Sequence, residues 1–119
     1  MAVTVTKELF SASTNGRPVA IDVVVSPGQT IHTAGTAAGL RDNISLWVMN
    51  GSTVTASQSQ VIFEFGGTTV ADQVRVQVVG SETIKVAHNW PLTASTSLLR
   101  AIATATGRLS AIGYVNRMV

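Results

Sequence analysis

The stretch 43-NISLWVMN-50 decides the fold that this sequence predicts. Its apolar residues Ile44, Leu46 and Val48 recur at every second position, which places them on one side of an extended strand. The turn dipeptide Asn50-Gly51 follows at once. A strand with one apolar side needs another layer to cover it, so the pattern indicates a β-sheet packed against a second layer.

The same period of two recurs on both sides of this stretch. Two short turns, 80-GSE-82 and Gly107-Arg108, predict that the strands flanking each of them form hairpins. The stretch 89-NWPLTAST-96 contains Pro91 and is predicted as a connection. The other segments predicted as strands are 19-VAIDVVVS-26, 29-QTIHTA-34, 61-VIFEFGG-67, 74-VRVQVVG-80, 83-TIKVAH-88 and 109-LSAIGYVNRM-118.

The segment 97-SLLRAIATAT-106 is ambiguous, because some of its apolar residues have helical spacing. Its threonines and the strand that follows so closely favour a strand. The chain then has about eight short strands at intervals typical of a sandwich, and no alternating helices. We predict an all-β protein, an antiparallel β-sandwich of jelly-roll or immunoglobulin-like topology, with residues 1–119 forming a single domain. Residues 1–10 are expected to form either an N-terminal arm or the first strand.

The composition excludes several classes of protein. There is no cysteine among the 119 residues, so disulfides, a thiol nucleophile and cysteine-bound metal are impossible. The eight lysines and arginines are scattered, which argues against a nucleic-acid partner. No apolar run approaches the roughly 20 residues of a membrane span, and the start lacks the basic-then-apolar order of a signal peptide. We therefore expect no contact with a membrane.

Residues with catalytic chemistry are not arranged as in known active sites. His32 and His88 lack the spacing of metal ligands. Gly66-Gly67 lacks the lysine of a phosphate-binding loop, and no serine stands in a nucleophile elbow. We therefore expect no enzymatic activity, no metal, no cofactor and no small-molecule substrate.

Two charged residues interrupt otherwise apolar strands. Asp22 and Arg100 each need an outward-facing position or a charged partner. We hypothesise that they pair with each other or with a neighbouring subunit.

Four motifs in residues 43–119 resemble those of small virion structural proteins of tailed bacteriophages. They are 63-FEFGGTT-69, 74-VRVQVVG-80, 90-WPL-92 and 113-GYVNR-117. The resemblance implies a β-sandwich that serves as a capsid decoration, or cement, protein. Such a protein is made in the host bacterial cytoplasm and lies on the outer surface of the capsid, often as a homotrimer, where it binds the major coat protein.

Two alternatives remain open at this point. One is a tail, neck or fibre-attachment component of the same kind of virion. The other is a β-sandwich module that binds glycan or protein, for which Trp90 is the best candidate for an exposed aromatic residue.

Interface residues are expected among arginines, because the guanidinium group suits interfacial ion pairs better than the lysine ammonium. The sequence has six arginines and two lysines. Asn116 is added as the polar end of the last strand, and Lys7 and Phe10 as members of the possible arm. The expected interface residues are Arg41, Arg108, Arg117, Asn116, Lys7, Phe10 and Trp90.

Overall fold

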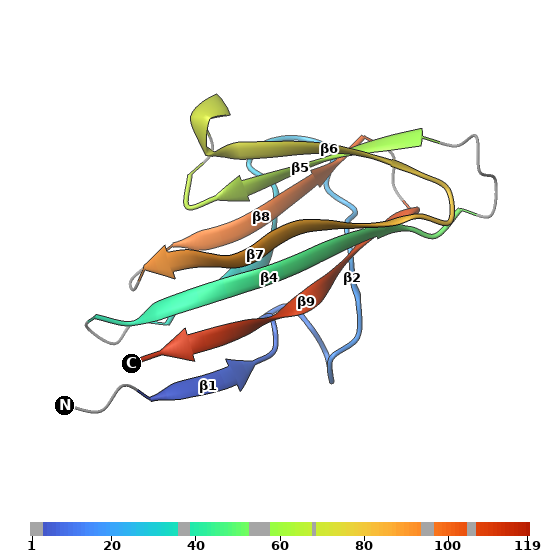
Figure 1. Cartoon of the computed structure of the whole chain (residues 1–119). Coiled ribbons are helices and arrows are strands. Elements are labelled where there is room, and N and C mark those ends of the chain that lie inside the picture. The colour runs from blue at the N-terminus through green and yellow to red at the C-terminus, as the bar shows by residue number, and fades with distance from the viewer. Residues whose placement is uncertain (1–3, 36–38, 53–57, 68, 94–96, 105–106) are drawn as a thin grey trace.

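A computed structural model describes residues 4–35, 39–52, 58–67, 69–93, 97–104 and 107–119 (Figure 1). Two antiparallel sheets face each other, as the sequence predicted. The strands are β1 (Val5–Glu8), β2 (Val19–Ala20), β3 (Gln29–Thr33), β4 (Arg41–Asn50), β5 (Gln58–Phe65), β6 (Gln73–Val79), β7 (Thr83–Thr93), β8 (Leu98–Ala103) and β9 (Leu109–Met118), and a 3-10 helix, η1 (Val70–Asp72), precedes β6.

Sheet A has the order β1-β9-β4-β7, with β2 also paired to β9, and sheet B has the order β3-β8-β5-β6. The pairing is nested, since β5 pairs with β6, β4 with β7, β3 with β8, and β1 and β2 with β9. A long antiparallel ribbon rolled up in this way is a jelly roll. The structure thus decides between the two topologies that the sequence left open.

Both predicted hairpins are wrong, for one topological reason. The turn at residues 80–82 joins β6 of sheet B to β7 of sheet A, and β8 and β9, which were predicted to pair across Gly107-Arg108, lie in sheet B and sheet A, respectively (Figure 1). In a rolled ribbon, a short turn between strands usually crosses from one sheet to the other. Among consecutive strands of the described chain, only β5 and β6 are hydrogen-bonded to each other.

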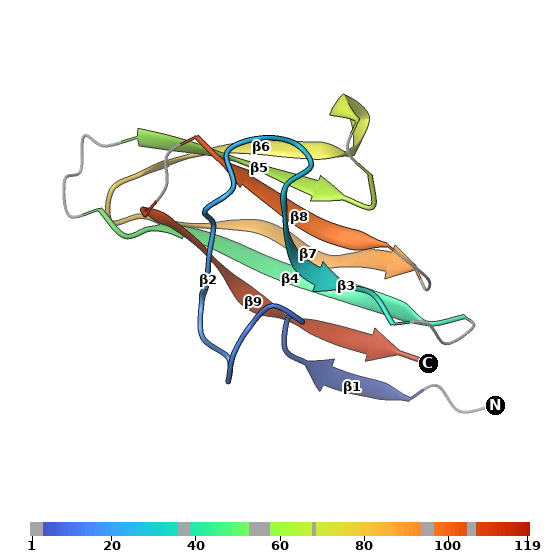
Figure 2. The same ribbon diagram turned by 180° about the vertical axis from the view of Figure 1, so that it is seen from behind.

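The predicted strand over 19–26 ends at Ala20. From there the chain crosses from sheet A to sheet B, with the Ile21 N–H donating to the Leu109 carbonyl and the Ala103 N–H donating to the Val23 carbonyl (Figure 2). The Gln29 side chain donates a hydrogen bond to the Ala20 carbonyl and accepts one from the Asp22 N–H. Val23, Val24 and Val25 have high β-propensity, but this segment forms no continuous ladder with a neighbouring strand, so tertiary context decides its conformation.

Two further segments were ambiguous or misassigned. The predicted connection at 89–96 is instead the end of β7, which continues through Pro91 to Thr93, while residues 94–96 lie outside the described part of the chain. Proline is tolerated there because β7 is an edge strand. The segment at 97–106 forms the strand β8, as predicted, over its described residues. No helix in the described ranges is long and apolar enough to cross a membrane.

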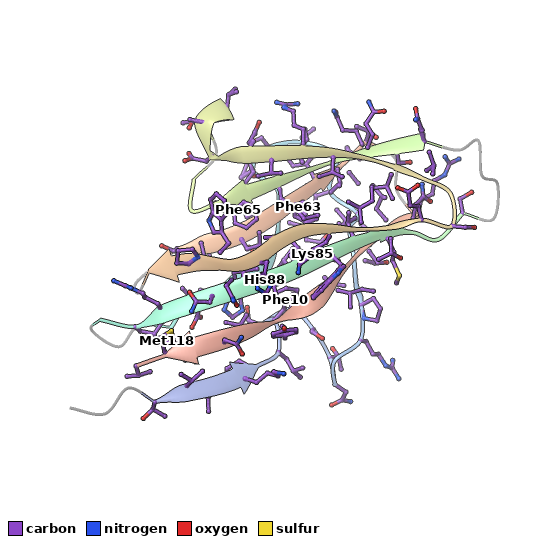
Figure 3. The ribbon with its side chains drawn as sticks, in the orientation of Figure 1. Phe10, Phe63, Phe65, Lys85, His88 and Met118 are labelled. Atoms are coloured by element: carbon purple, nitrogen blue, oxygen red, sulfur yellow. The ribbon has the colours of Figure 1, made fainter. Side chains whose placement is uncertain are left out.

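The core lies between the two sheets. Ile44, Leu46 and Val48 of β4 are buried, as their alternation predicts. Val61 and Phe63, on the inner side of β5 in sheet B, belong to the same core. Figure 3 labels Phe63. Strand alternation therefore identified the inward-facing residues of β4 correctly.

Candidate interaction surface

The outer face of sheet A is the broad surface opposite the core. Because Ile44, Leu46 and Val48 point inward, the intervening residues of β4 point outward, and register extends this assignment to the paired strands. We define the outer face of sheet A by Val5 and Lys7 of β1, Ser110, Ile112, Tyr114, Asn116 and Met118 of β9, Arg41, Asn43, Trp47 and Met49 of β4, and Thr83, Lys85 and Pro91 of β7. Ser45 of β4 lies on the same side of the strand but is fully buried.

Four side chains cross this face in a line, which we call the aromatic row: Lys7, Tyr114, Trp47 and Lys85. Each comes from a different strand of sheet A. The Lys7 ammonium lies 4.6 Å from the centre of the Tyr114 ring. That ring lies 6.2 Å from the Trp47 ring, and the Lys85 ammonium lies 5.4 Å from the centre of the Trp47 ring. Cation–π contacts of about 0.5–1 kcal/mol at exposed sites hold both lysines over the rings.

Charge is distributed unequally over the molecule. The outer face of sheet A carries three cations, Lys7, Arg41 and Lys85, and none of the six carboxylates of the chain. All six carboxylates lie in described segments. They are Glu8 on the inner side of β1, the buried Asp42 and Glu64, and Asp22, Asp72 and Glu82 outside the sheet A strands.

The outer side of sheet B has a different character. Arg75 and Gln77 are exposed on β6. On β5, Glu64 points away from the core and is nevertheless fully buried, because the segment 26–28 covers it. Among the residues that the structure describes, the outer side of sheet A therefore combines apolar, aromatic and cationic groups, whereas that of sheet B does not.

Behind the outer face, a buried polar network joins the two sheets. Asp42 of β4 is fully buried. Its carboxylate accepts hydrogen bonds from Arg117 Nε at 2.8 Å and Arg117 Nη2 at 3.0 Å, both from the neighbouring strand β9. It also accepts one from His32 Nε2 at 2.8 Å, from β3 of sheet B. The Gly35 N–H adds a longer contact of 3.3 Å.

A backbone N–H sets the tautomer of His32. The Ser11 N–H donates to His32 Nδ1 at 3.1 Å, so Nδ1 is an acceptor and the ring proton sits on Nε2, facing Asp42. His32 and Asp42 thus have the geometry of a histidine oriented by an acid. The other ring nitrogen meets a backbone amide where a catalytic triad would place a hydroxyl. The arrangement serves as a clamp between the sheets.

Two opposing effects determine the charge of Asp42. Burial raises the pKa of its carboxyl, but the hydrogen bonds from Arg117 and His32, together with the Arg117 charge, lower it by more. The net pKa lies below its ordinary value, so Asp42 is ionised at neutral pH. The hydrogen bond to Asp42 raises the pKa of Arg117.

Glu64 is the second fully buried carboxylate. It accepts hydrogen bonds from the Gly28 N–H at 2.9 Å, from Gln73 Nε2 at 3.2 Å and from the Ser26 hydroxyl at 3.3 Å. These bonds fasten the crossing segment onto the outer side of sheet B.

The expected interface residues fall in several places. Lys7, Asn116 and Arg41 lie on the outer face of sheet A, where Lys7 and Asn116 are cross-strand neighbours. Arg108 is exposed just before β9, and Arg117 is bound to Asp42 of its own chain.

Two aromatic residues on that list lie elsewhere. Phe10 is buried in the core beside His32 and has no surface to offer a neighbour. Trp90 is exposed, and the centre of its ring lies 4.9 Å from that of Phe65, which links β7 of sheet A to β5 of sheet B. Neither contributes to the outer face of sheet A.

The hypothesis that Asp22 pairs with Arg100 is wrong within the chain. No ion pair joins the two residues, both of which lie in described segments. Asp22 is exposed, whereas Arg100 stands opposite Glu64 in the ladder between β5 and β8.

The aromatic row and the buried clamp were both missed from the sequence. The row had a local signal, because Trp47 alternates with the apolar residues of β4 and had to face outward. The clamp had none, since its three side chains come from strands far apart in the chain. No protein-family model matches this sequence, and no curated protein matches it either.

Proposed function

We propose that this protein is a structural component of a tailed-phage virion, a capsid decoration protein that binds the coat through the outer face of sheet A. The observation that carries the proposal is the character of this face. It combines the half-buried Trp47 and Tyr114 with three cations and no carboxylate. Interfaces favour aromatic residues over scattered charge, and the excess of cations fits a coat surface that bears carboxylates.

The proposed mechanism is mechanical. The jelly roll supplies a rigid, two-layered body, and the clamp on Asp42 fixes β9 to β4 directly behind the binding face. Repetition of the contact over a symmetric shell turns modest affinity at each site into strong overall binding. No step of this role requires catalysis. The four motifs in residues 43–119 that resemble those of phage virion proteins support the same assignment.

The test is sedimentation of purified protein with coat shells that lack it. We expect the wild-type protein to bind, and Lys7→Glu and Lys85→Glu variants to lose about tenfold in affinity each, because each reversal opposes the proposed carboxylates. The matched control is Arg75→Glu on the outer side of sheet B, which should bind like the wild type. Equal loss from all three variants would reject the assigned face. Recovery of the protein in tails and not in shells would reject the capsid location.

A further inference from the structure

The sandwich has four sheet edges, and three of them are blunted. Edge strands carry unpaired N–H and C=O groups that can template pairing with another chain, so proteins usually cover or distort them. One edge of sheet A is formed by β1, with the two-residue β2 paired farther along β9, and the other by β7. The edges of sheet B are β3 and β6.

The edge of β3 is capped by the segment that follows β1. The Ala12 N–H donates to the Ile31 carbonyl at 3.1 Å. The Thr33 N–H donates to Ser11 Oγ at 2.8 Å. This edge already has its partner.

The edges of β7 and β6 are blunted in other ways. The pairing of β7 with β4 shifts register twice, Asn89 adopts φ 51°, and Pro91 removes a donor. On β6, the Val78 carbonyl accepts from Asn50 Nδ2 at 2.9 Å, and the exposed Arg75 adds a charge. Bulges, proline and charge are the usual protections of an edge.

The described residues of β1 contain neither a bulge nor a proline, although the strand carries the charged residues Lys7 and Glu8. Its pairing with β9 runs without a register shift from Val5 to Glu8. Thr4 and Val119 exchange both backbone hydrogen bonds. Since such pairs alternate, Thr6 and Glu8 also bond to β9, and the backbone groups of Val5 and Lys7 face the open side.

Apolar side chains at this edge are exposed and could pack against a second chain. Val5 is 58% exposed, Leu9 is 50% exposed and Val119 is 55% exposed. Lysine often protects an edge, but the ammonium of Lys7 is held over the Tyr114 ring of its own sheet. The charge is thereby drawn away from the open side.

We propose that β1 pairs antiparallel with β1 of a second copy of this chain, about a two-fold axis through Thr6. The open backbone groups belong to Val5 and Lys7, so only registers that join these residues satisfy them. Pairing Lys7 with Lys7 opposes like charges, whereas pairing Val5 with Lys7 of the second copy opposes none. The latter register makes about four backbone hydrogen bonds and sets the two Thr6 side chains face to face.

The pairing joins the two sheets A into one continuous sheet and brings their outer faces side by side. It does not depend on the proposed function, because it uses backbone groups of β1, whereas the proposed function uses side chains of the outer face. A two-fold contact of this kind is self-complementary, so it closes at two copies and does not propagate into fibres. The threefold assembly expected from the resemblance would need a different surface.

Cysteine cross-linking tests the register directly, because the chain has no cysteine of its own. In the proposed register the two Thr6 residues form a non-hydrogen-bonded pair with Cα atoms about 4.5 Å apart, within reach of a disulfide. We expect Thr6→Cys to form a covalent dimer under mild oxidation about tenfold faster than Gln77→Cys, an exposed control on β6. Glu8→Cys, on the same strand but away from the axis, should match the control.

A proline variant tests the edge independently. Lys7→Pro removes an N–H that faces the open side, so β1 keeps its ladder with β9 while the dimer is lost; Lys7→Ala should remain dimeric. Sedimentation velocity measures the dimer, and circular dichroism shows that each variant is folded. A monomeric wild type at every concentration, a dimeric Lys7→Pro variant, or equal cross-linking of Thr6→Cys and Gln77→Cys would overturn the proposal. Failure of coat binding with intact dimers would affect only the proposed function.

Discussion

Arg117 grips Asp42 with two hydrogen bonds, from Nε at 2.8 Å and from Nη2 at 3.0 Å, across the ladder between β9 and β4. The two residues are cross-strand partners, so the backbone register itself aligns the guanidinium with the carboxylate. His32 reaches the same carboxylate from the other sheet. The Asp42 carboxylate therefore links three strands, β3, β4 and β9, and its loss should weaken contacts in both sheets.

We expect Asp42→Asn to destabilise the protein by about 3 kcal/mol, because the buried end of Arg117 loses its countercharge and His32 loses an acceptor. Urea denaturation followed by tryptophan fluorescence measures the free energy of unfolding. The exposed Asp22→Asn is the matched control and should change it by less than about 0.5 kcal/mol. Similar values for the two variants would contradict the clamp.

The stabilising effect of Asp42 should depend on pH in a defined direction. Its pKa in the folded protein lies below the ordinary value of 3.8. Its contribution is therefore complete well above pH 3.8 and is lost as the pH falls through the folded pKa. The stability difference between wild type and Asp42→Asn, measured by urea denaturation, should be constant near neutrality and shrink on acidification below that value. A stability difference that grows on acidification would contradict a lowered pKa for Asp42.

Glu64→Ala should destabilise the protein by about 1–3 kcal/mol, because the partly buried Gly28 N–H loses its acceptor. The segment 21–28 should also exchange its amide hydrogens faster, since Glu64 fastens it to sheet B. Glu64→Gln keeps an acceptor oxygen and should lie between the alanine variant and the wild type. Unchanged exchange in the alanine variant would show that other contacts hold the segment.

Gly113→Ala should destabilise the protein by about 2 kcal/mol, because the added Cβ would collide with the carbonyl oxygen of Ser45 on the adjacent strand. Gly51→Ala is the control, since a Cβ there would make an ordinary contact of 3.6 Å with the Arg108 carbonyl oxygen. The midpoints of thermal unfolding compare the two. A tolerated alanine at position 113 would mean that β4 and β9 can separate locally without cost.

Trp47→Ala should cost about 1 kcal/mol or less in stability, because the ring lies half-buried on the outer face and its loss leaves no closed cavity. Phe63→Ala, which empties a fully buried site, should cost about 3–5 kcal/mol. Chemical denaturation measures the free energy of unfolding of both variants and so distinguishes a residue of the outer face from a residue of the core. Equal costs would place Trp47 in the structural core.

The sequence predicted some features of the surface and missed others. Lys7 and Asn116 were expected at an interface and do lie on the outer face of sheet A, although their contact with a partner stays a prediction. Phe10 was placed on the same list because it followed an alternating segment. The chain turns inward after β1, and such a turn has no local signature that distinguishes it from an arm.

The sequence by itself determined the class of fold and the inward-facing residues of β4. Alternation is a local property, because successive side chains of a strand point to opposite sides whatever the strand pairs with. This is why Ile44, Leu46 and Val48 could be assigned to the interior.

Only the tertiary structure decided which strands are neighbours. A tight turn such as 80–82 has the same residues whether it closes a hairpin or crosses between sheets, and burial of both sheets in one core selects the crossing. The same long-range packing brings His32, Asp42 and Arg117 together and leaves β1 with an open edge. Pairing energy depends on the residue that lies opposite, and the rolled topology sets that residue.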